Sequence, residues 1–399
     1  MTVDEQKREQ GEADQAGRNA KWPFSALKAF ERYFPARRSS PKTNVPDPLP
    51  ETTTGRRRAS TLEQSLDKDA SLPEKVVTHE LEVVGDDHAR DEEDTAPQTV
   101  LYLAYGSNLA AKTFRGTRGI RPLSELKVLV PSLRLTFDLP GIPYTEPCFA
   151  GTRSRTPGSE GGWIGETSDD TREDEEEEEE EREKRDGKPL LPNGYRKDRW
   201  RKPLVGVVYE VTLSDYARII ATEGGGRGYR DVVVDCFPFP EKYDPSDPVP
   251  DTPTTEPFKA HTLLSPATDT PGTTSPASPL HLHLPIDASY AQPSARYLDL
   301  IRTGAAEHNL PTSYQAYLAQ IRAYRVTTPR QRVGQVLFLA LWAPGLMLTL
   351  FLSRVLAGPD GISPAWLIRF ADVLLAAMWK SYYIAFRPVF GDGLRTIGE

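Results

Sequence analysis

The sequence predicts an α+β protein with one folded domain followed by apolar C-terminal helices. Three short segments with the composition of β-strands come first, at 99–104, 204–211 and 231–237. Two segments with helical spacing of apolar residues follow, at 295–309 and 313–324. Strands followed by helices in this order are typical of α+β domains. The pattern alone does not predict whether the strands close into a barrel.

The composition limits how much of the 399-residue chain can fold. It includes 36 Pro and 27% charged residues, and its mean hydropathy is −0.51. Long segments of this kind bury too little apolar surface to offset the entropy lost on ordering. We therefore expect a disordered N-terminal region at 1–98 and a folded domain at 99–325. Polar inserts near 168–200 and 238–285 interrupt that domain, and a hydrophobic region at 326–399 follows it.

The distribution of charge excludes some partners. The net charge is −8, and a run of acidic residues at 173–181 supplies much of it. Such a run is typical of a solvated insert, with an interaction tract as the alternative. No basic face is apparent, so we expect no nucleic-acid partner. The two cysteines, Cys148 and Cys236, show neither metal-ligand spacing nor a disulfide framework, which suits a reducing compartment.

The first candidate site is the turn Tyr105-Gly106-Ser107-Asn108, which directly follows the strand at 99–104. Glycine allows the backbone to turn sharply and to approach a ligand closely. The N–H groups of such a turn suit a carboxylate or an oxyanion. An ordinary junction between a strand and a helix has the same pattern, so these four residues do not decide the function.

The second candidate is Glu223, which ends an expected helix at 213–222 and precedes three glycines. A partly buried carboxylate in this position can exchange protons as a general acid or base. A glycine C-cap with a solvated glutamate beside it produces the same pattern. Neither candidate is therefore specific by itself.

Three segments, taken in order, resemble the γ-glutamylcyclotransferases. They are the strand and turn at 101–109, the segment GVVYEVTLSDYARIIATEGGGRGYRDVVVDC at 206–236, and PSARYLDLIRTGAAEHNLPTSYQAYL at 293–318. The resemblance covers about 99–325 without the two inserts. It implies a mixed β-sheet or barrel with flanking helices, in a long, fungal-like form with a C-terminal hydrophobic segment.

The resemblance also implies a reaction and a site. The reaction is the cyclisation of an L-γ-glutamyl amino acid or amine to 5-oxoproline with release of the amine. This is the reaction of a carbon–nitrogen lyase of the amidine-lyase type, and it needs no metal and no organic cofactor. The catalytic carboxylate corresponds to Glu223. The implied substrate-binding residues are Tyr102, Leu103, Ala104, Tyr105, Gly106, Ser107, Tyr229 and Tyr297.

Two alternatives stay open. A sister class of enzymes acts specifically on glutathione and looks similar at the turn, but it usually has Leu where this chain has Asn108. The chain could instead be a non-catalytic, membrane-tethered binding module that keeps the fold. The presence of Glu223 favours an enzyme, because a retired site would be free to lose its carboxylate.

The uncharged run at 333–353 predicts a helix that spans or deeply enters a membrane. About 20 residues at about 1.5 Å each match a hydrocarbon core of roughly 30 Å. A buried core helix is the alternative. The stretch at 366–386 contains charges and predicts an interfacial helix, or one packed on the first. Basic residues before the run place the folded domain in the cytosol: Arg322, Arg325, Arg330 and Arg332.

Overall fold

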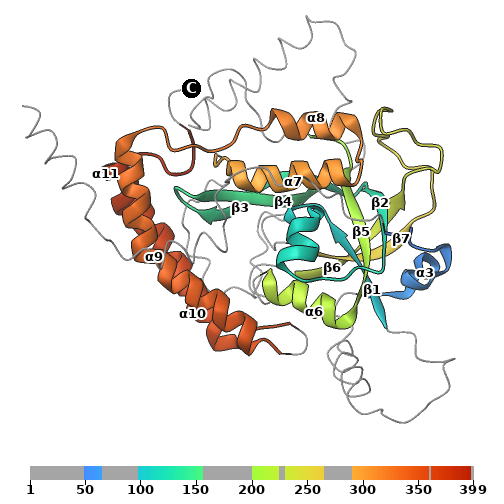
Figure 1. Cartoon of the computed structure of the whole chain (residues 1–399), viewed down its shortest axis with the longest axis horizontal. Coiled ribbons are helices and arrows are strands. Elements are labelled where there is room, and N and C mark those ends of the chain that lie inside the picture. Colours follow the sequence, from blue (N-terminus) through green and yellow to red (C-terminus); the bar gives the residue numbers. More distant parts are fainter. Residues whose placement is uncertain are drawn as a thin grey trace, which may run out of the picture.

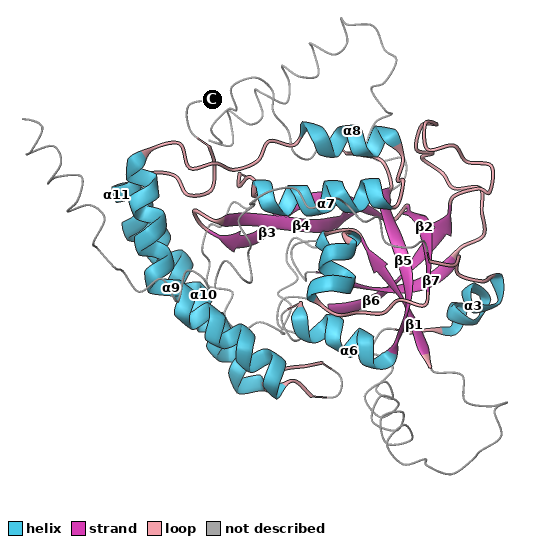
Figure 2. Ribbon diagram, viewed as in Figure 1, coloured by secondary structure: helices cyan, strands magenta, loops and turns pink. Residues whose placement is uncertain are grey.

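The computed structural model describes residues 49–64, 98–155, 200–223, 230–264, 290–358 and 361–396. Within these ranges, five strands form a closed β-barrel on one side of the molecule, at the right in Figures 1 and 2, with the strand order β1-β5-β2-β6-β7. Its paired strands are antiparallel except for β1 and β7, which are parallel. The strands are β1 (Thr99–Ala104), β2 (Ser124–Val130), β5 (Leu204–Thr212), β6 (Arg230–Pro238) and β7 (Phe258–Leu264).

Strand β5 is the centre of the barrel wall because it pairs with two neighbours. Val208 lies opposite Leu103 of β1 and opposite Leu126 of β2. Nearly every residue of β5 is buried, which explains why its sequence reads as a continuous apolar run rather than as an alternating one. Gly206 permits close approach of β1, since a Cβ there would lie 2.8 Å from the carbonyl oxygen of Ala104. The α+β class predicted from the sequence is confirmed.

A second, two-stranded sheet extends from the barrel. It consists of β3 (Leu133–Ile142) and β4 (Glu146–Ser154). Its connecting turn contains Tyr144, which has a positive φ of 65° and a fully buried side chain. The Tyr144 ring packs 5.7 Å from that of Phe338 in the C-terminal helices. This sheet therefore ties the C-terminal region to the folded domain.

Three helices flank the sheets: α6 (Leu213–Thr222), α7 (Ala295–Glu307) and α8 (Thr312–Gln320). Each of the first two begins at a side-chain cap of the kind that satisfies the free N–H groups of a first turn. The hydroxyl of Thr212 accepts from the N–H of Asp215, and that of Ser294 accepts from the N–H of Tyr297. These caps fix where α6 and α7 start.

Residues 49–64 are folded, contrary to the disorder predicted for 1–98. They form α3 (Thr54–Ala59) and η1 (Ser60–Leu62) against the barrel. Arg56 donates to the hydroxyl and to the carbonyl of Thr99, both at 2.9 Å, and pairs with Glu63 at 2.7 Å. The sequence of this segment is mostly polar, so its local pattern gives no sign of the partners that order it.

The insert predicted at 238–285 is not entirely a loop, because β7 lies within it. This strand is hard to recognise from hydropathy, since two of its buried residues are His261 and Thr262. Thr262 donates to the carbonyl oxygen of Leu103 at 3.2 Å. Of the insert predicted near 168–200, only Trp200 lies among the described residues; its ring packs 5.0 Å from that of Tyr314.

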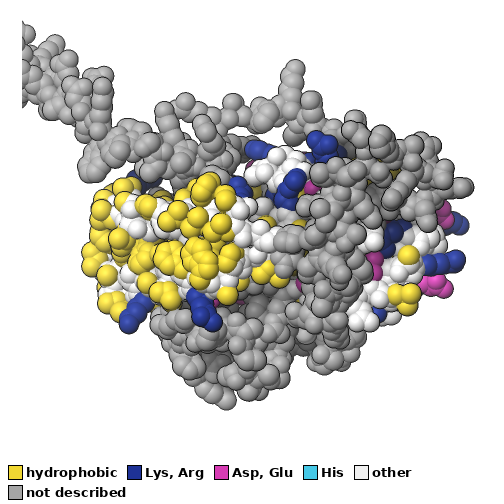
Figure 3. Space-filling view, turned by 90° about the horizontal axis from the view of Figure 1, so that it is seen from below, with side chains coloured by type: hydrophobic (Ala, Val, Ile, Leu, Met, Phe, Trp, Pro, Cys, Tyr) yellow, Lys and Arg dark blue, Asp and Glu magenta, His cyan; other side chains and the backbone are white. Residues whose placement is uncertain are grey.

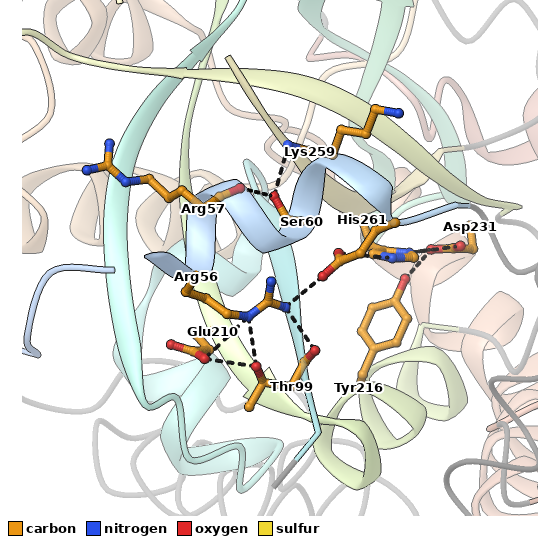
Figure 4. Close-up of polar contacts among 10 residues, drawn as sticks. Arg56, Arg57, Ser60, Thr99, Glu210, Tyr216, Asp231, Lys259 and His261 are labelled. Carbon is orange, nitrogen blue, oxygen red and sulfur yellow. Dashed lines mark hydrogen bonds and ion pairs between the residues drawn. The ribbon is translucent and has the colours of Figure 1, made fainter. Parts of the chain in front are cut away.

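A buried polar network joins the N-terminal segment 49–64 to the barrel (Figure 4). His261 of β7 lies 3.0 Å from both carboxylate oxygens of Asp231 and 3.5 Å from Glu63. The hydroxyl of Tyr216 also donates to Asp231. Burial by itself lowers the pKa of His261, but the carboxylates of Asp231 and Glu63 outweigh it and raise that pKa to about 9. His261 is therefore charged at neutral pH.

We expect the free energy of unfolding to fall as the pH rises through about 9. The pKa of His261 in the folded state lies above its unfolded value of about 6.5, so its stabilisation is complete below about pH 6.5 and is lost as the pH passes about 9. The loss should be on the order of 3 kcal/mol. Urea unfolding across this pH range measures it. In the His261→Gln variant, the free energy of unfolding should depend much less on pH. If it falls with pH as steeply as in the parent chain, His261 is not the group responsible.

The C-terminal region is an antiparallel helical hairpin. Its members are α9 (Pro329–Leu356), α10 (Ala365–Ser381), η4 (Tyr382–Phe386) and α11 (Arg387–Phe390). Trp342 donates to Ser381 at 3.0 Å, and Gly345 faces Leu374. The segment after the uncharged run thus packs on the first helix, one of the two arrangements predicted for it. Among the described helices, α9 is long and apolar enough to cross a membrane, by length and composition.

Candidate active site

The structure places Glu223 beside the glycine turn. Glu223 is the C-cap of α6, and Asn108 lies in the short helix η2 (Ser107–Leu109) that begins within the turn. The Asn108 side-chain nitrogen donates to Glu223 Oε1 at 3.0 Å and to the Tyr102 hydroxyl at 2.8 Å. One amide thus fixes the carboxylate relative to the end of β1.

Arg118 binds the same carboxylate oxygen as Asn108. It follows η3 (Lys112–Thr117), and its guanidinium donates to Glu223 Oε1 at 2.5 Å and to the hydroxyl of Thr222. The side chains of Arg118 and Glu223 are only 12% and 21% exposed, so solvent screens the pair weakly. A charge-assisted bond of this kind stabilises negative charge on the carboxylate. No sequence motif marked Arg118.

Tyr297 closes the other edge of the turn. Its hydroxyl accepts from the N–H of Ala150 in β4 at 3.1 Å. A Cβ added to Gly106 would lie 3.3 Å from this hydroxyl, closer than an ordinary van der Waals contact. Glycine is therefore favoured at 106 because the Tyr297 hydroxyl lies so close to the backbone. A left-handed conformation is not the reason, since the φ of Gly106 is −108°.

The Pro293-Ser294 pair before Tyr297 has a structural role. Ser294 caps α7, and its hydroxyl donates to the carboxylate of Glu146, which is 2% exposed. Arg296 donates to the same carboxylate at 2.6 Å. These contacts anchor the first turn of α7 to β4, and they thereby orient Tyr297 toward the glycine turn.

The tyrosines of the site are neutral hydroxyl groups. Burial raises the pKa of Tyr102, Tyr105 and Tyr297 far above that of a free phenol, and the negative charge of Glu223 raises each further. The Tyr105 hydroxyl donates to the carbonyl oxygen of Leu263 at 3.2 Å. At physiological pH these groups therefore serve as hydrogen-bond partners and not as bases.

The remaining predicted residues divide into two groups. The side chains of Leu103 and Ala104 are fully buried on the two faces of β1, so any substrate contact they make is through the backbone. Gly106 and Ser107 are partly exposed at the turn. Tyr229 lies outside the described residues. In the described part of the chain, no three His, Cys, Asp or Glu side chains are grouped to hold a metal ion.

One buried acceptor beside the carboxylate has no partner among the described residues. It is the side-chain oxygen of Asn108, a residue that is 3% exposed. A buried polar atom without a hydrogen bond costs about 1–3 kcal/mol, so such an atom at a site indicates a place for a donor from a ligand. This acceptor lies on the same amide that holds Glu223.

A small barrel that holds an arginine-paired carboxylate beside a glycine turn and neutral phenols has the arrangement of an acid–base enzyme. Gamma-glutamyl cyclotransferase gliK of Aspergillus fumigatus is 32% identical over 296 residues, which cover 74% of this chain and 89% of gliK. Gamma-glutamyl cyclotransferase aclK of Aspergillus oryzae is 30% identical over 306 residues, covering 74% of this chain and 89% of aclK. The chain belongs to the gamma-glutamyl cyclotransferase family.

Two further comparisons concern parts of the chain. Residues 328–389, which contain α9, α10, η4 and most of α11, match the family model of the AclK C-terminal domain. A solved structure of a gamma-glutamyl cyclotransferase covers 58% of this chain and 92% of its own, with 17% identity and a TM-score of 0.33. The fold class stated above rests on the barrel topology of this chain.

Proposed function

We propose that the protein is a γ-glutamylcyclotransferase. It converts the glutamyl unit of an L-γ-glutamyl amino acid or amine to 5-oxoproline and releases the amine, as a carbon–nitrogen lyase. Family membership supports the general activity. The observation that carries the assignment to this site is the amide of Asn108, which binds both Glu223 and Tyr102 at the glycine turn.

Glu223 is the proposed general base and then the general acid. Its carboxylate takes a proton from the substrate's α-ammonium group, and the freed amine attacks the γ-carbonyl carbon of the same glutamyl unit. A new carbon–nitrogen bond forms, and the carbonyl oxygen becomes an oxyanion. As the oxyanion collapses, the bond to the leaving nitrogen breaks and Glu223 returns the first proton to that nitrogen. The ring nitrogen still carries a second proton, which Glu223 takes and passes to the released amine, so that the ring is left as a neutral lactam and the amine leaves as an ammonium. The carboxylate is thereby restored, and no water or oxidant is consumed.

Two neighbours of Glu223 suit the substrate's charged groups. The side-chain oxygen of Asn108, which has no partner among the described residues, can accept from the α-ammonium group and direct it toward the carboxylate. The N–H groups that lead η2 at Ser107 and Asn108 lack acceptors within that helix by its geometry. They are proposed to bind the developing oxyanion or the substrate's α-carboxylate. Because attacking and leaving groups belong to one molecule, holding its shape supplies much of the rate.

The test is a substrate panel with the purified full-length chain. We expect γ-glutamyl-alanine to yield 5-oxoproline and alanine in equal amounts, with glutathione a poor substrate. Both products are measured by chromatography, because equal release distinguishes cyclisation from other losses of substrate. Release from glutathione alone would establish the glutathione-specific alternative. Absence of 5-oxoproline from a panel of γ-glutamyl amino acids and amines would favour a non-catalytic module.

A further inference from the structure

The C-terminal hairpin presents a continuous apolar face to the outside. On α9, exposed apolar residues recur at intervals of three, four or seven, which places them on one side of the helix. Trp366, Phe370 and Val373 continue this face on α10 and are 44–56% exposed. Figure 3 shows these side chains gathered into one patch. The α9 members of the apolar face are Val333, Leu337, Leu341, Leu348, Phe351 and Val355.

Both ends of α9 are attached to the folded domain, so the hairpin lies along its side (Figure 1). Near the N-terminal end, the Gln335 side chain donates to the carbonyl oxygen of Tyr144 at 2.7 Å. Near the other end, α9 packs against α6, and Gly361 in the following loop contacts the backbone of Ala217 in that helix. A helix attached in this way cannot cross a bilayer unless these contacts break.

Basic side chains border the apolar face. Five exposed arginine and lysine side chains lie on α9 and α10, and dark blue side chains stand at the edge of the patch in Figure 3. Asp372 is the one acidic residue among the described residues of 329–390. An apolar helical face with a basic border is the arrangement of helices that lie in the plane of a membrane surface. The bordering residues are Arg330, Arg332, Arg354, Arg369 and Lys380.

We propose that the apolar face of α9 and α10 docks on an anionic lipid surface, with both helices in the plane of the headgroups. A second copy of the chain fits less well, because a two-fold contact through this face would oppose one basic border to another. Negatively charged headgroups neutralise that border instead. The proposal does not depend on the proposed catalytic function, and it replaces the spanning helix predicted from the sequence.

Co-sedimentation of the full-length chain with vesicles tests the proposal. We expect binding to vesicles of phosphatidylcholine with phosphatidylserine, much weaker binding to phosphatidylcholine alone, and a decrease as salt is added. The double variant Leu341→Glu with Phe351→Glu should bind about 100-fold more weakly, because two large apolar side chains no longer enter the surface. Leu62→Glu is the matched control, since Leu62 is 86% exposed on η1, outside the hairpin.

Three results would overturn the proposal. One is equal vesicle binding by the double variant and the Leu62→Glu control, provided that both melt like the parent chain by circular dichroism. Another is resistance of membrane-bound protein to extraction with high salt and alkaline carbonate, which would establish a spanning helix. The last is a lipid-free dimer, seen by analytical ultracentrifugation, that Phe351→Glu converts to a monomer, which would make the face a subunit interface.

Discussion

Glu223→Gln should lower the kcat for 5-oxoproline release by roughly 10²–10⁴-fold, the usual cost of removing a positioned acid–base group. The amide keeps the shape of the side chain and can still contact Asn108 and Arg118, so the fold should survive. It can neither take the proton of the α-ammonium group nor return one to the leaving nitrogen. The measurement is steady-state release of 5-oxoproline from γ-glutamyl-alanine by the full-length chain.

A matched substitution separates this effect from a general loss of charge. Glu241 is exposed in the loop after β6, so Glu241→Gln should leave the rate unchanged. If Glu223→Gln releases 5-oxoproline at the normal rate, Glu223 is not the general base. If neither the parent nor any variant releases 5-oxoproline, the failure lies with the proposed function itself.

The position of the carboxylate should matter as well as its presence. Asn108→Ala removes the amide that fixes Glu223, and misplacement by about 1 Å can cost about 10²-fold in rate. Asn108 is proposed to hold Glu223 and to direct the α-ammonium group toward that carboxylate, so both of its contacts serve the same proton transfer and the two substitutions should be strongly non-additive. Additive losses would show that Asn108 and Glu223 act independently.

Gly304→Ala should destabilise the protein and impair the site at the same time. Gly304 of α7 packs directly on Leu109 of η2, and a Cβ there would lie 2.6 Å from the backbone nitrogen of Ala110. Neither backbone can move without shifting Asn108 or Tyr297. Overpacking of this kind costs about 1–3 kcal/mol, equivalent to a fall of roughly 2–12 °C in Tm for a domain of about this size.

Gly116→Ala is the control for this prediction. Gly116 is also helical, in η3, but a Cβ there meets no described atom closer than 4.0 Å, at the carbonyl oxygen of Ala111. It should be neutral or slightly stabilising, because alanine restricts the unfolded chain more than glycine does. Thermal unfolding followed by circular dichroism compares the two. An unchanged Tm for Gly304→Ala would show that α7 and η2 are not held as closely as described.

The elements that frame the site can be predicted from local sequence patterns. Strands β1 and β5 and helices α6 and α7 follow from local apolar patterns, because an element that buries a face has apolar residues at a regular spacing along the chain. The turn at Tyr105-Gly106 and the carboxylate of Glu223 were also recognised, through the order of three segments. The structure then places Glu223 beside Asn108, 115 residues away in the chain.

The pairing of polar groups cannot be predicted in this way, because it depends on the folded chain. Arg118 binds Glu223 across 105 residues, and Arg56 binds Thr99 across 43, so neither contact leaves a periodic signal. Strand β7 is not predicted from the sequence for the same reason. Its residues His261 and Thr262 are polar, and they are stable when buried only because their hydrogen-bond partners come from other elements. Local hydropathy records what a residue prefers, whereas long-range hydrogen bonds and ion pairs exist only once the chain has folded.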